Sequence, residues 1–376
     1  MVCYNYNELL RCEAATKQKK AEIEVYILDT KWVKIPAEKA DKHVLKEAGE
    51  IIQGGGLVAF PTETVYGLGG DAMNPESAKK IYAAKGRPSD NPLIVHICKT
   101  EDMEKIVREV PKQAYVLAER FWPGPLTMIM KKADCVPKET TGGLDTVAVR
   151  LPDHPVALAF IREAGGFVAA PSANTSGRPS PTLGKYVYED MNGRIEMILD
   201  GGEVGIGVES TIIDLTEDIP VVLRPGYVTW EMLQEVLGEV CLDPTMLEID
   251  CQQAPKAPGM KYRHYAPRGE LVIVSGDREK VSDKIGQLLT EKRELGFKTG
   301  VIVSKEEEHL YRADSVKVTG DRTDMAAVAR NLFRILREFD DENIDCMYVQ
   351  AFPKDGIGQA VMNRMLKAAG HRIIEV

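Results

Sequence analysis

The chain has 376 residues, more than one hydrophobic core usually organises, so two or three domains are expected. Apolar residues make up 44% of it, and no apolar run approaches the roughly 18 residues of a membrane-spanning helix, so we expect a soluble, cytoplasmic protein. Seven cysteines without a CxxC pair exclude a zinc knuckle and predict reduced thiols. A net charge of -9 argues against a general nucleic-acid binder, so any RNA contact is expected to be weak and local.

Four segments are expected along the chain. Residues 1–24 lack clear periodicity and are interpreted as an N-terminal extension. Residues 25–240 mix short apolar segments at 57–60, 93–97, 146–151 and 167–170 with helical patterns, which predicts a large α/β domain. Prolines interrupt any regular element at 241–269, as in an interdomain linker. Order resumes in a smaller domain at 270–376.

Two helices of the large domain carry clear start and stop signals. Asn74 can cap the first, Pro75 suits its first position, and Gly86 ends it. The second begins at Thr229 and ends at Gly238.

The smaller domain alternates strands with helices, which predicts a doubly wound, Rossmann-like sheet. We expect its elements at 271–274, 277–295, 300–303, 324–339, 343–349, 358–369 and 371–376. Gly356 and Gly358 form a lone GxG, which is weak evidence for a bound cofactor.

Cations and small polar residues suggest a site for an anionic ligand. Lys85 and Arg87 should project from one face, because Pro88 biases Arg87 toward an extended conformation, and two adjacent cations suit a polyphosphate or a carboxylate. A solvated helix end would also explain the pair. Alternation at 146–151 places Thr146 and Arg150 on one small, polar face, which suits either a cleft wall or a water-facing edge strand.

Further polar residues follow the apolar segments. The loop at 171–180 is dense in small donors and acceptors, and Arg224 ends an apolar run before a turn. His96 alternates with apolar neighbours and suits either a ligand site or a satisfied buried histidine. No P-loop, GxSxG elbow, HExxH or spaced His/Cys cluster occurs, so no metal site formed by protein ligands is expected.

Six motifs in one order resemble the YrdC/Sua5 family. They are residues 61–69 (PTETVYGLG), 85–93 (KGRPSDNPL), 123–127 (PGPLT), 171–177 (PSANTSG), 209–214 (ESTIID) and 223–226 (LRPG). Residues 258–267 (PGMKYRHYAP) further resemble the linker of the two-domain Sua5 branch. The resemblance implies a twisted mixed α/β sheet domain, of YrdC type, followed by a smaller Rossmann-like Sua5 domain.

The implied activity is that of an L-threonylcarbamoyladenylate synthase, a nucleotidyltransferase. Such an enzyme makes threonylcarbamoyl-AMP and pyrophosphate from L-threonine, bicarbonate or CO2, and ATP with Mg²⁺. The product supplies the threonylcarbamoyl group of t6A at position 37 of tRNA, which a separate threonylcarbamoyl transferase would attach.

Carried onto this sequence, the resemblance implies specific roles. Lys85, Arg87 and Arg224 would stabilise the reacting phosphates, and the residues for L-threonine would be Thr64, His96, Arg150 and Ser210. The ATP-binding residues would be Lys85, Arg87, Asn91, Thr146, Ser172, Asn174, Ser180, Arg224, His264 and Tyr262.

Two rival interpretations remain at this point. A carbamoyl-phosphate-dependent adenylating enzyme could share the fold, although such chains carry zinc-finger segments that the absence of CxxC pairs excludes here. An RNA-binding module could use the same cations, which the acidic overall charge disfavours.

Overall fold

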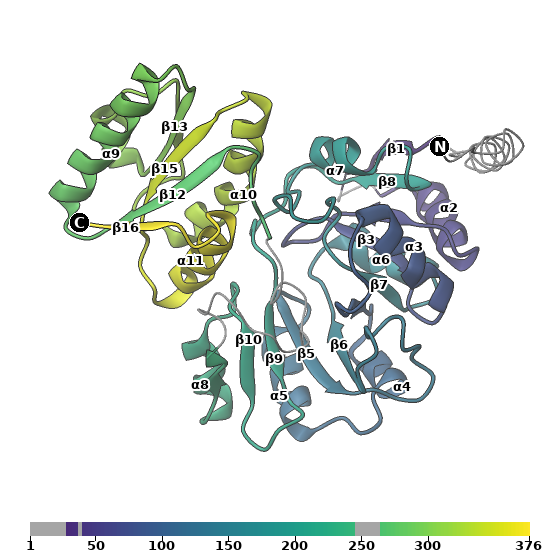
Figure 1. Ribbon diagram of the computed structural model, residues 1–376. Coiled ribbons are helices and arrows are strands. Elements are labelled where there is room, and N and C mark those ends of the chain that lie inside the picture. Colours follow the sequence, from purple (N-terminus) through teal and green to yellow (C-terminus); the bar gives the residue numbers. More distant parts are fainter. Residues whose placement is uncertain (1–27, 37–39, 245–263) are drawn as a thin grey trace, which may run out of the picture.

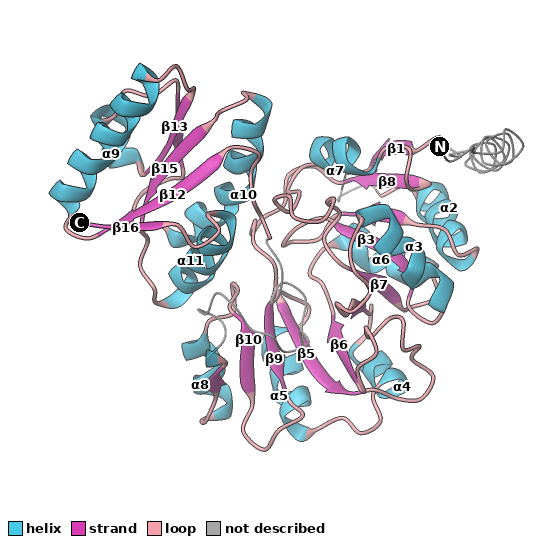
Figure 2. Cartoon of the chain, viewed as in Figure 1, coloured by secondary structure: helices cyan, strands magenta, loops and turns pink. Residues whose placement is uncertain are grey.

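The computed structural model describes residues 28–36, 40–244 and 264–376, which form two α/β units (Figure 1). Within these residues the larger unit contains an eleven-stranded sheet and the smaller unit a five-stranded sheet. Both units carry helices against their sheets (Figure 2). No helix among the described residues combines the length and apolar character needed to cross a membrane.

The larger unit runs from β1 to β11. Its strands are β1 (Lys31–Lys34), β2 (Val58–Phe60), β3 (Gly67–Asp71), β4 (Ile94–His96), β5 (Leu126–Lys131), β6 (Thr146–Arg150), β7 (Val168–Ala170), β8 (Met197–Asp200), β9 (Thr211–Asp214), β10 (Val221–Arg224) and β11 (Cys241–Leu242). Its helices are α2 (Lys42–Gln53), α3 (Pro75–Lys85), the 3-10 turn η2 (Thr100–Asp102), α4 (Met103–Ile106), α5 (Lys112–Phe121), α6 (Pro155–Glu163), α7 (Gly184–Met191) and α8 (Trp230–Leu237).

The large sheet is mixed, as predicted. Its strand order is β1-β8-β2-β3-β7-β4-β6-β5-β9-β10-β11, with β4 parallel to β6 and antiparallel to β7. The register places His96 beside Arg150 across β4 and β6, so two of the predicted site residues end neighbouring strands at the same edge.

Local signals explain several element boundaries. The side chain of Asn74 accepts a hydrogen bond from the backbone of Glu76 and caps α3, while Gly86 ends that helix at a φ of 62°, which glycine adopts without steric cost. Thr229 caps α8 in the same way through the backbone of Met232. The predicted helix boundaries at these positions are therefore confirmed.

The smaller unit is an all-parallel sheet of order β14-β13-β15-β12-β16. Its elements are β12 (Glu270–Ser275), α9 (Arg278–Glu294), β13 (Thr299–Val303), the 3-10 turn η4 (Lys305–Leu310), β14 (Ser315–Val318), α10 (Met325–Asp341), β15 (Cys346–Gln350), α11 (Gly356–Ala368) and β16 (Ile373–Glu375). Gly358 has a packing role, because a Cβ there would lie 2.3 Å from the carbonyl oxygen of Pro353.

Helices α10 and α11 lie between the small sheet and the larger unit, and α9 covers the opposite face (Figure 1). The core beneath α10 and α11 extends across the boundary, because Val65 and Val208 of the larger unit belong to it. Tyr265 joins the same core, with its ring centroid 5.0 Å from that of Phe333 on α10. The two units therefore share buried apolar surface.

Candidate functional site

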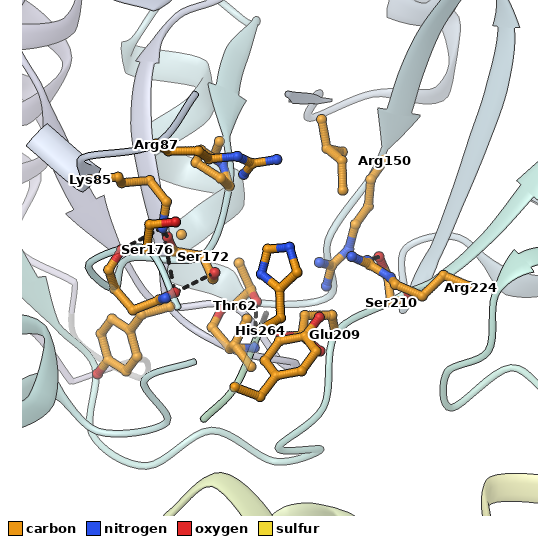
Figure 3. Close-up of a pocket in the computed structure, with 18 of the residues that line it drawn as sticks. Thr62, Lys85, Arg87, Arg150, Ser172, Ser176, Glu209, Ser210, Arg224 and His264 are labelled. Atoms are coloured by element: carbon orange, nitrogen blue, oxygen red, sulfur yellow. Dashed lines mark hydrogen bonds between the residues drawn. The ribbon is translucent and has the colours of Figure 1, made fainter. Parts of the chain in front are cut away.

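A cavity that is partly open to solvent lies in the larger unit where several strands end. Its lining comes from β4, β6, β7 and β10, the end of α3, the loops at 171–177 and 209–210, and His264 and Tyr265 from the segment before the small unit. Figure 3 shows Lys85 and Arg87 on one side of the cavity, Arg150, Ser210 and Arg224 on the other, and His264 between them.

Most of the predicted site residues meet in this cavity. Those that line it are Lys85, Arg87, His96, Arg150, Ser172, Asn174, Ser210, Arg224 and His264. Four other predicted residues, Thr64, Asn91, Thr146 and Ser180, do not line it. Tyr262 lies outside the described residues.

Lys85 is buried at the end of α3 and organises the opposite loop. Its Nζ lies 2.5 Å from the carbonyl oxygen of Ser172, 2.5 Å from that of Asn174 and 3.5 Å from Asn174 Oδ1. Burial, and then the charge on Arg87, lower the pKa of the Lys85 amine well below its ordinary value. Three oxygen acceptors match the three N–H donors of the charged ammonium, so this geometry favours the charged form.

Ser172 and Asn174 form the small polar floor next to Lys85. Ser172 Oγ lies 2.5 Å from Asn174 Oδ1, and Asn174 Nδ2 donates to the carbonyl oxygens of Thr175 and Arg178. The loop is therefore held by its own side chains as well as by Lys85, and it presents hydroxyl and amide groups in a fixed arrangement.

Arg150 ends β6 and forms a buried ion pair with Glu63. Arg150 Nη2 lies 2.7 Å from Glu63 Oε1, and the two side chains are 5% and 12% exposed. Arg150 Nε and Glu63 Oε2 are buried without a hydrogen-bond partner in the described part of the chain. A guanidinium with an unused donor beside a cavity is suited to take up a ligand carboxylate.

Ser210 and Arg224 form a connected pair on the same side. Arg224 donates to the carbonyl oxygen of Ser210 from Nε at 3.1 Å and from Nη2 at 2.9 Å, and Ser210 Oγ lies 2.7 Å from Thr127 Oγ1. Burial lowers the pKa of the Arg224 guanidinium to about 10, which still leaves it charged at neutral pH.

His96 is neutral in this setting. It is 3% exposed, and its Nδ1 lies 3.1 Å from the carbonyl oxygen of Ile94. Burial, followed by the nearby charge of Arg150, lowers the pKa of His96 to about 3. His96 therefore lines the cavity and also has a hydrogen-bond partner on the backbone. The two alternatives from the sequence, a ligand site and a satisfied buried histidine, both describe it.

The predicted residues that miss the cavity do so for different geometric reasons. Thr146 shares a face with Arg150 but begins β6 where Arg150 ends it, so the two lie at opposite ends of the strand. Thr64 and Asn91 are fully buried behind the lining, and Ser180 Oγ is occupied by Glu209 Oε1 at 2.5 Å. Alternation predicts a face of a strand, not a position along it.

Several lining residues have no role predicted from the sequence, and four of them are the polar residues Thr62, Ser176, Glu209 and Tyr265. All four lie inside the motifs and the linker segment that resemble the YrdC/Sua5 family, and this resemblance is the one sequence feature that could have pointed to them. Their individual importance could not be read from the pattern, because polar residues in such loops are equally common as turn formers.

The cavity is strongly cationic. Among the described residues it is lined by Lys85, Arg87, Arg150 and Arg224 against the one carboxylate of Glu209, which is itself paired with an arginine. No group of three or more metal-ligating side chains occurs within the described part of the chain. The arrangement suits a ligand with several negative charges, such as a polyphosphate or a carboxylate.

Comparisons with known proteins agree with this geometry. A family model for the Sua5, YciO and YrdC proteins, described as "Telomere recombination", matches residues 50–226, and one described as "Threonylcarbamoyl-AMP synthase, C-terminal domain" matches residues 228–370. A threonylcarbamoyl-AMP synthase from Pyrococcus abyssi is 50% identical over 339 residues, which cover 90% of this chain and 98% of that protein. The chain belongs to the threonylcarbamoyl-AMP synthase family.

Other members of the family agree over the same length. A threonylcarbamoyl-AMP synthase from Bacillus subtilis is 47% identical over 331 residues, covering 88% of this chain and 94% of that protein. A solved structure of the Pyrococcus abyssi Sua5 protein complexed with L-threonine superposes with a TM-score of 0.87 at 48% identity, covering 92% of this chain and all of the other. The predicted family, its nucleotidyltransferase class and the two-unit α/β fold are thereby confirmed.

Proposed function

We propose that this chain makes threonylcarbamoyl-AMP and pyrophosphate from ATP, L-threonine and bicarbonate or CO2. The observation that carries the proposal is the single cavity in which four cations meet small hydroxyl and amide groups with no free carboxylate. The cavity is concave and partly open, and it combines apolar walls with a few convergent polar groups, as small-molecule sites do. The family relationship supplies the identity of the substrates.

The reaction needs no side-chain nucleophile. The neutral amine of threonine forms an N–C bond to CO2 while one C=O π bond becomes a carboxylate oxygen, and the nitrogen loses one proton to solvent, which gives an N-carboxylate. An oxygen of that carboxylate bonds to the α-phosphorus of ATP while the bond from phosphorus to the pyrophosphate oxygen breaks. Attacker and target are both anionic, so the barrier falls mainly through charge neutralisation and alignment.

The described side chains divide this work. We assign the threonine carboxylate to Arg150, whose Nε has no partner among the described residues, with Ser210 and neutral His96 beside it. Lys85, Arg87 and Arg224 face the phosphates, and Ser172 and Asn174 belong to the nucleotide side of the cavity. Thr64, Asn91 and Ser180, which are buried but do not line the cavity, would act only by supporting it, and Thr146 at the far end of β6 would have no direct part.

Magnesium would enter with ATP as part of the substrate. The one carboxylate in the described lining, Glu209, is engaged by Arg364 and Ser180, so this lining offers no set of carboxylates to a divalent ion. Phosphate oxygens would supply most of the ligands of Mg²⁺, and the arginines would neutralise the remaining charge.

Pyrophosphate release by the purified protein tests the proposal. The reaction contains ATP, Mg²⁺ and bicarbonate, with L-threonine, serine, carbamoyl phosphate or no addition. Release that depends on L-threonine, with threonylcarbamoyl-AMP detected by mass spectrometry, is the expected result. Release with carbamoyl phosphate alone would favour the rival adenylation.

The RNA-binding alternative has a separate test. Gel shifts against tRNA and duplex RNA over a salt series would reveal tight, strongly salt-dependent binding if the cavity cations served RNA. We expect weak binding at physiological salt, because the net charge of -9 opposes association with a polyanion. The product would then pass to a separate threonylcarbamoyl transferase that acts on tRNA.

A further inference from the structure

One arginine of the smaller unit reaches the catalytic loops of the larger unit. Arg364 lies on α11 and its side chain is 0% exposed. Its Nε lies 3.0 Å from Glu209 Oε2, its Nη2 donates to the carbonyl oxygen of Glu209 at 3.3 Å, and its Nη1 donates to the carbonyl oxygen of Pro225. The guanidinium therefore holds two separate segments at once.

These two segments carry residues of the cavity. Glu209 precedes Ser210, and Pro225 follows Arg224. Arg224 in turn donates two hydrogen bonds to the carbonyl oxygen of Ser210, so the two segments meet at a single point. Arg364 lies behind this contact, and its hydrogen bonds set the separation between the segments.

The sheet alone does not position these residues. The ladder of β9 and β10 has an irregular register between Val222 and Arg224, and its last described pair joins Arg224 to Ile212. Residues 209–210 and 225–226 therefore lie beyond the regular hydrogen bonds of the ladder. Side-chain contacts add to the few backbone contacts that hold them, and a planar guanidinium with several donors is suited to that task.

The electrostatics of Glu209 agree with a preformed clamp. Burial alone would raise the pKa of its carboxyl, but Arg364, Arg224 and the Ser180 hydroxyl hold it below its ordinary value. A buried ion pair of this kind contributes little net stability compared with apolar packing, while its geometry restricts the positions of its partners. The ion pair between Arg364 and Glu209 is therefore better explained as a device that positions Glu209 than as a source of stability.

We propose that Arg364 is a positioning residue for the cavity, acting from the smaller unit through Glu209 and Pro225 on Ser210 and Arg224. The site of this chain is then incomplete without α11. This inference rests on the proposed function for the identity of the ligands, but the positioning itself can be measured without turnover.

The test uses the full-length protein and three variants. Arg364→Gln removes the charge and most of the donors, and Arg364→Lys keeps the charge but cannot hold both segments. Arg334→Gln is the matched control, because Arg334 on α10 also forms an ion pair across the boundary, with Glu203 at 3.4 Å, and Glu203 does not line the cavity. Melting curves first establish a temperature at which every variant is folded.

Three measurements follow at that temperature. Hydrogen exchange read by mass spectrometry should show faster exchange at 209–212 and 225–228 in Arg364→Gln. The dissociation constant for MgATP, from calorimetry, should rise on the order of tenfold, because a cation of the phosphate site is displaced. The value of kcat/KM for L-threonine should fall on the order of a hundredfold, the cost of a displacement of about 1 Å. Arg364→Lys should lie between, and Arg334→Gln should stay within about twofold of the native protein.

The outcomes separate this inference from the proposed function. A folded Arg364→Gln protein with native exchange, binding and turnover would overturn the inference, as would equal losses in Arg334→Gln. Faster exchange and weaker MgATP binding in a protein that shows no threonine-dependent pyrophosphate release would support positioning while the proposed function fails. If Arg364→Gln does not fold, the same three measurements on Arg364→Lys decide.

Discussion

Arg150 and Glu63 lie 87 positions apart and form a buried ion pair, with 2.7 Å between Nη2 and Oε1. Glu63 Oε2 and Arg150 Nε have no hydrogen-bond partner among the residues that the structure describes. The pair therefore leaves part of the hydrogen-bonding capacity of Arg150 unused, and a carboxylate ligand in the cavity would accept from it.

Replacing Glu63 by Gln should show how far Arg150 depends on a neighbouring carboxylate. The substitution leaves the buried Arg150 charge uncompensated, so we expect the free energy of unfolding to fall by about 3 kcal/mol. L-Threonine should then raise the melting temperature more in the variant than in the native protein, because its carboxylate restores the missing charge. Glu47→Gln is the control, since Glu47 pairs with Lys31 at the surface and should matter little. A smaller threonine shift in Glu63→Gln would contradict this account.

Arg150→Lys should separate threonine binding from nucleotide binding. Lysine keeps the charge but loses the planar fork that can serve Glu63 and a ligand together. We expect kcat/KM for L-threonine to fall on the order of thirtyfold, while the dissociation constant for MgATP changes by less than about threefold. Steady-state kinetics and calorimetry check the two values. Equal losses for both substrates would remove the assignment of Arg150 to threonine.

His96 should make the protein sensitive to acid. Its pKa is near 3 in the folded protein and about 6.5 when unfolded, so its neutral form contributes stability that is complete above about pH 6.5 and is lost as pH falls toward 3. At pH 5 the loss should be about 2 kcal/mol. Urea unfolding at pH 7 and pH 5 should show a smaller difference for His96→Gln than for the native protein. Parallel losses in both proteins would show that His96 does not cause the effect.

Lys85 should take up protons when MgATP binds. Burial and Arg87 lower its pKa in the free protein, and an approaching triphosphate favours the charged amine, so the pKa should rise in the complex. Calorimetry over a series of pH values, each in two buffers of different ionisation enthalpy, should reveal proton uptake on binding. Lys79→Met should preserve that uptake, because Lys79 is fully exposed on the same helix, and Lys85→Arg should abolish it. Uptake that persists in Lys85→Arg would assign the proton to another group.

Two glycines of one loop should respond differently to alanine. A Cβ at Gly207 would lie 2.4 Å from the Cα of Arg330 on α10, and the residue has a φ of 86°, so Gly207→Ala should destabilise the contact between the units by about 2 kcal/mol or more. The nearest atom to a Cβ at Gly205 is 3.9 Å away, so Gly205→Ala should be nearly neutral. Equal melting temperatures for the two variants would refute the predicted clash.

Much of the fold follows from local chemistry. The capping side chain of Asn74 and the left-handed conformation of Gly86 delimit α3 where the sequence placed it, because both effects act within one helical turn. The strand alternation around Arg150 was equally readable, since successive side chains point to opposite faces. The alternation did not predict that Thr146 lies away from the cavity, because residues at the two ends of a strand can point to the same face.

By itself, the sequence determined the α/β class, the helix boundaries with capping signals, and the six motifs that name the family, since these depend on neighbours along the chain. Only the tertiary structure decided that Arg150 pairs with Glu63, that Lys85 donates to the carbonyl oxygen of Ser172, and that Arg364 forms an ion pair with Glu209. Glu209 and Arg364 are 155 positions apart. Residues this far apart meet only because whole helices and strands pack together. A buried charge then needs an opposite charge close by, and no periodicity along the chain predicts which residue supplies it.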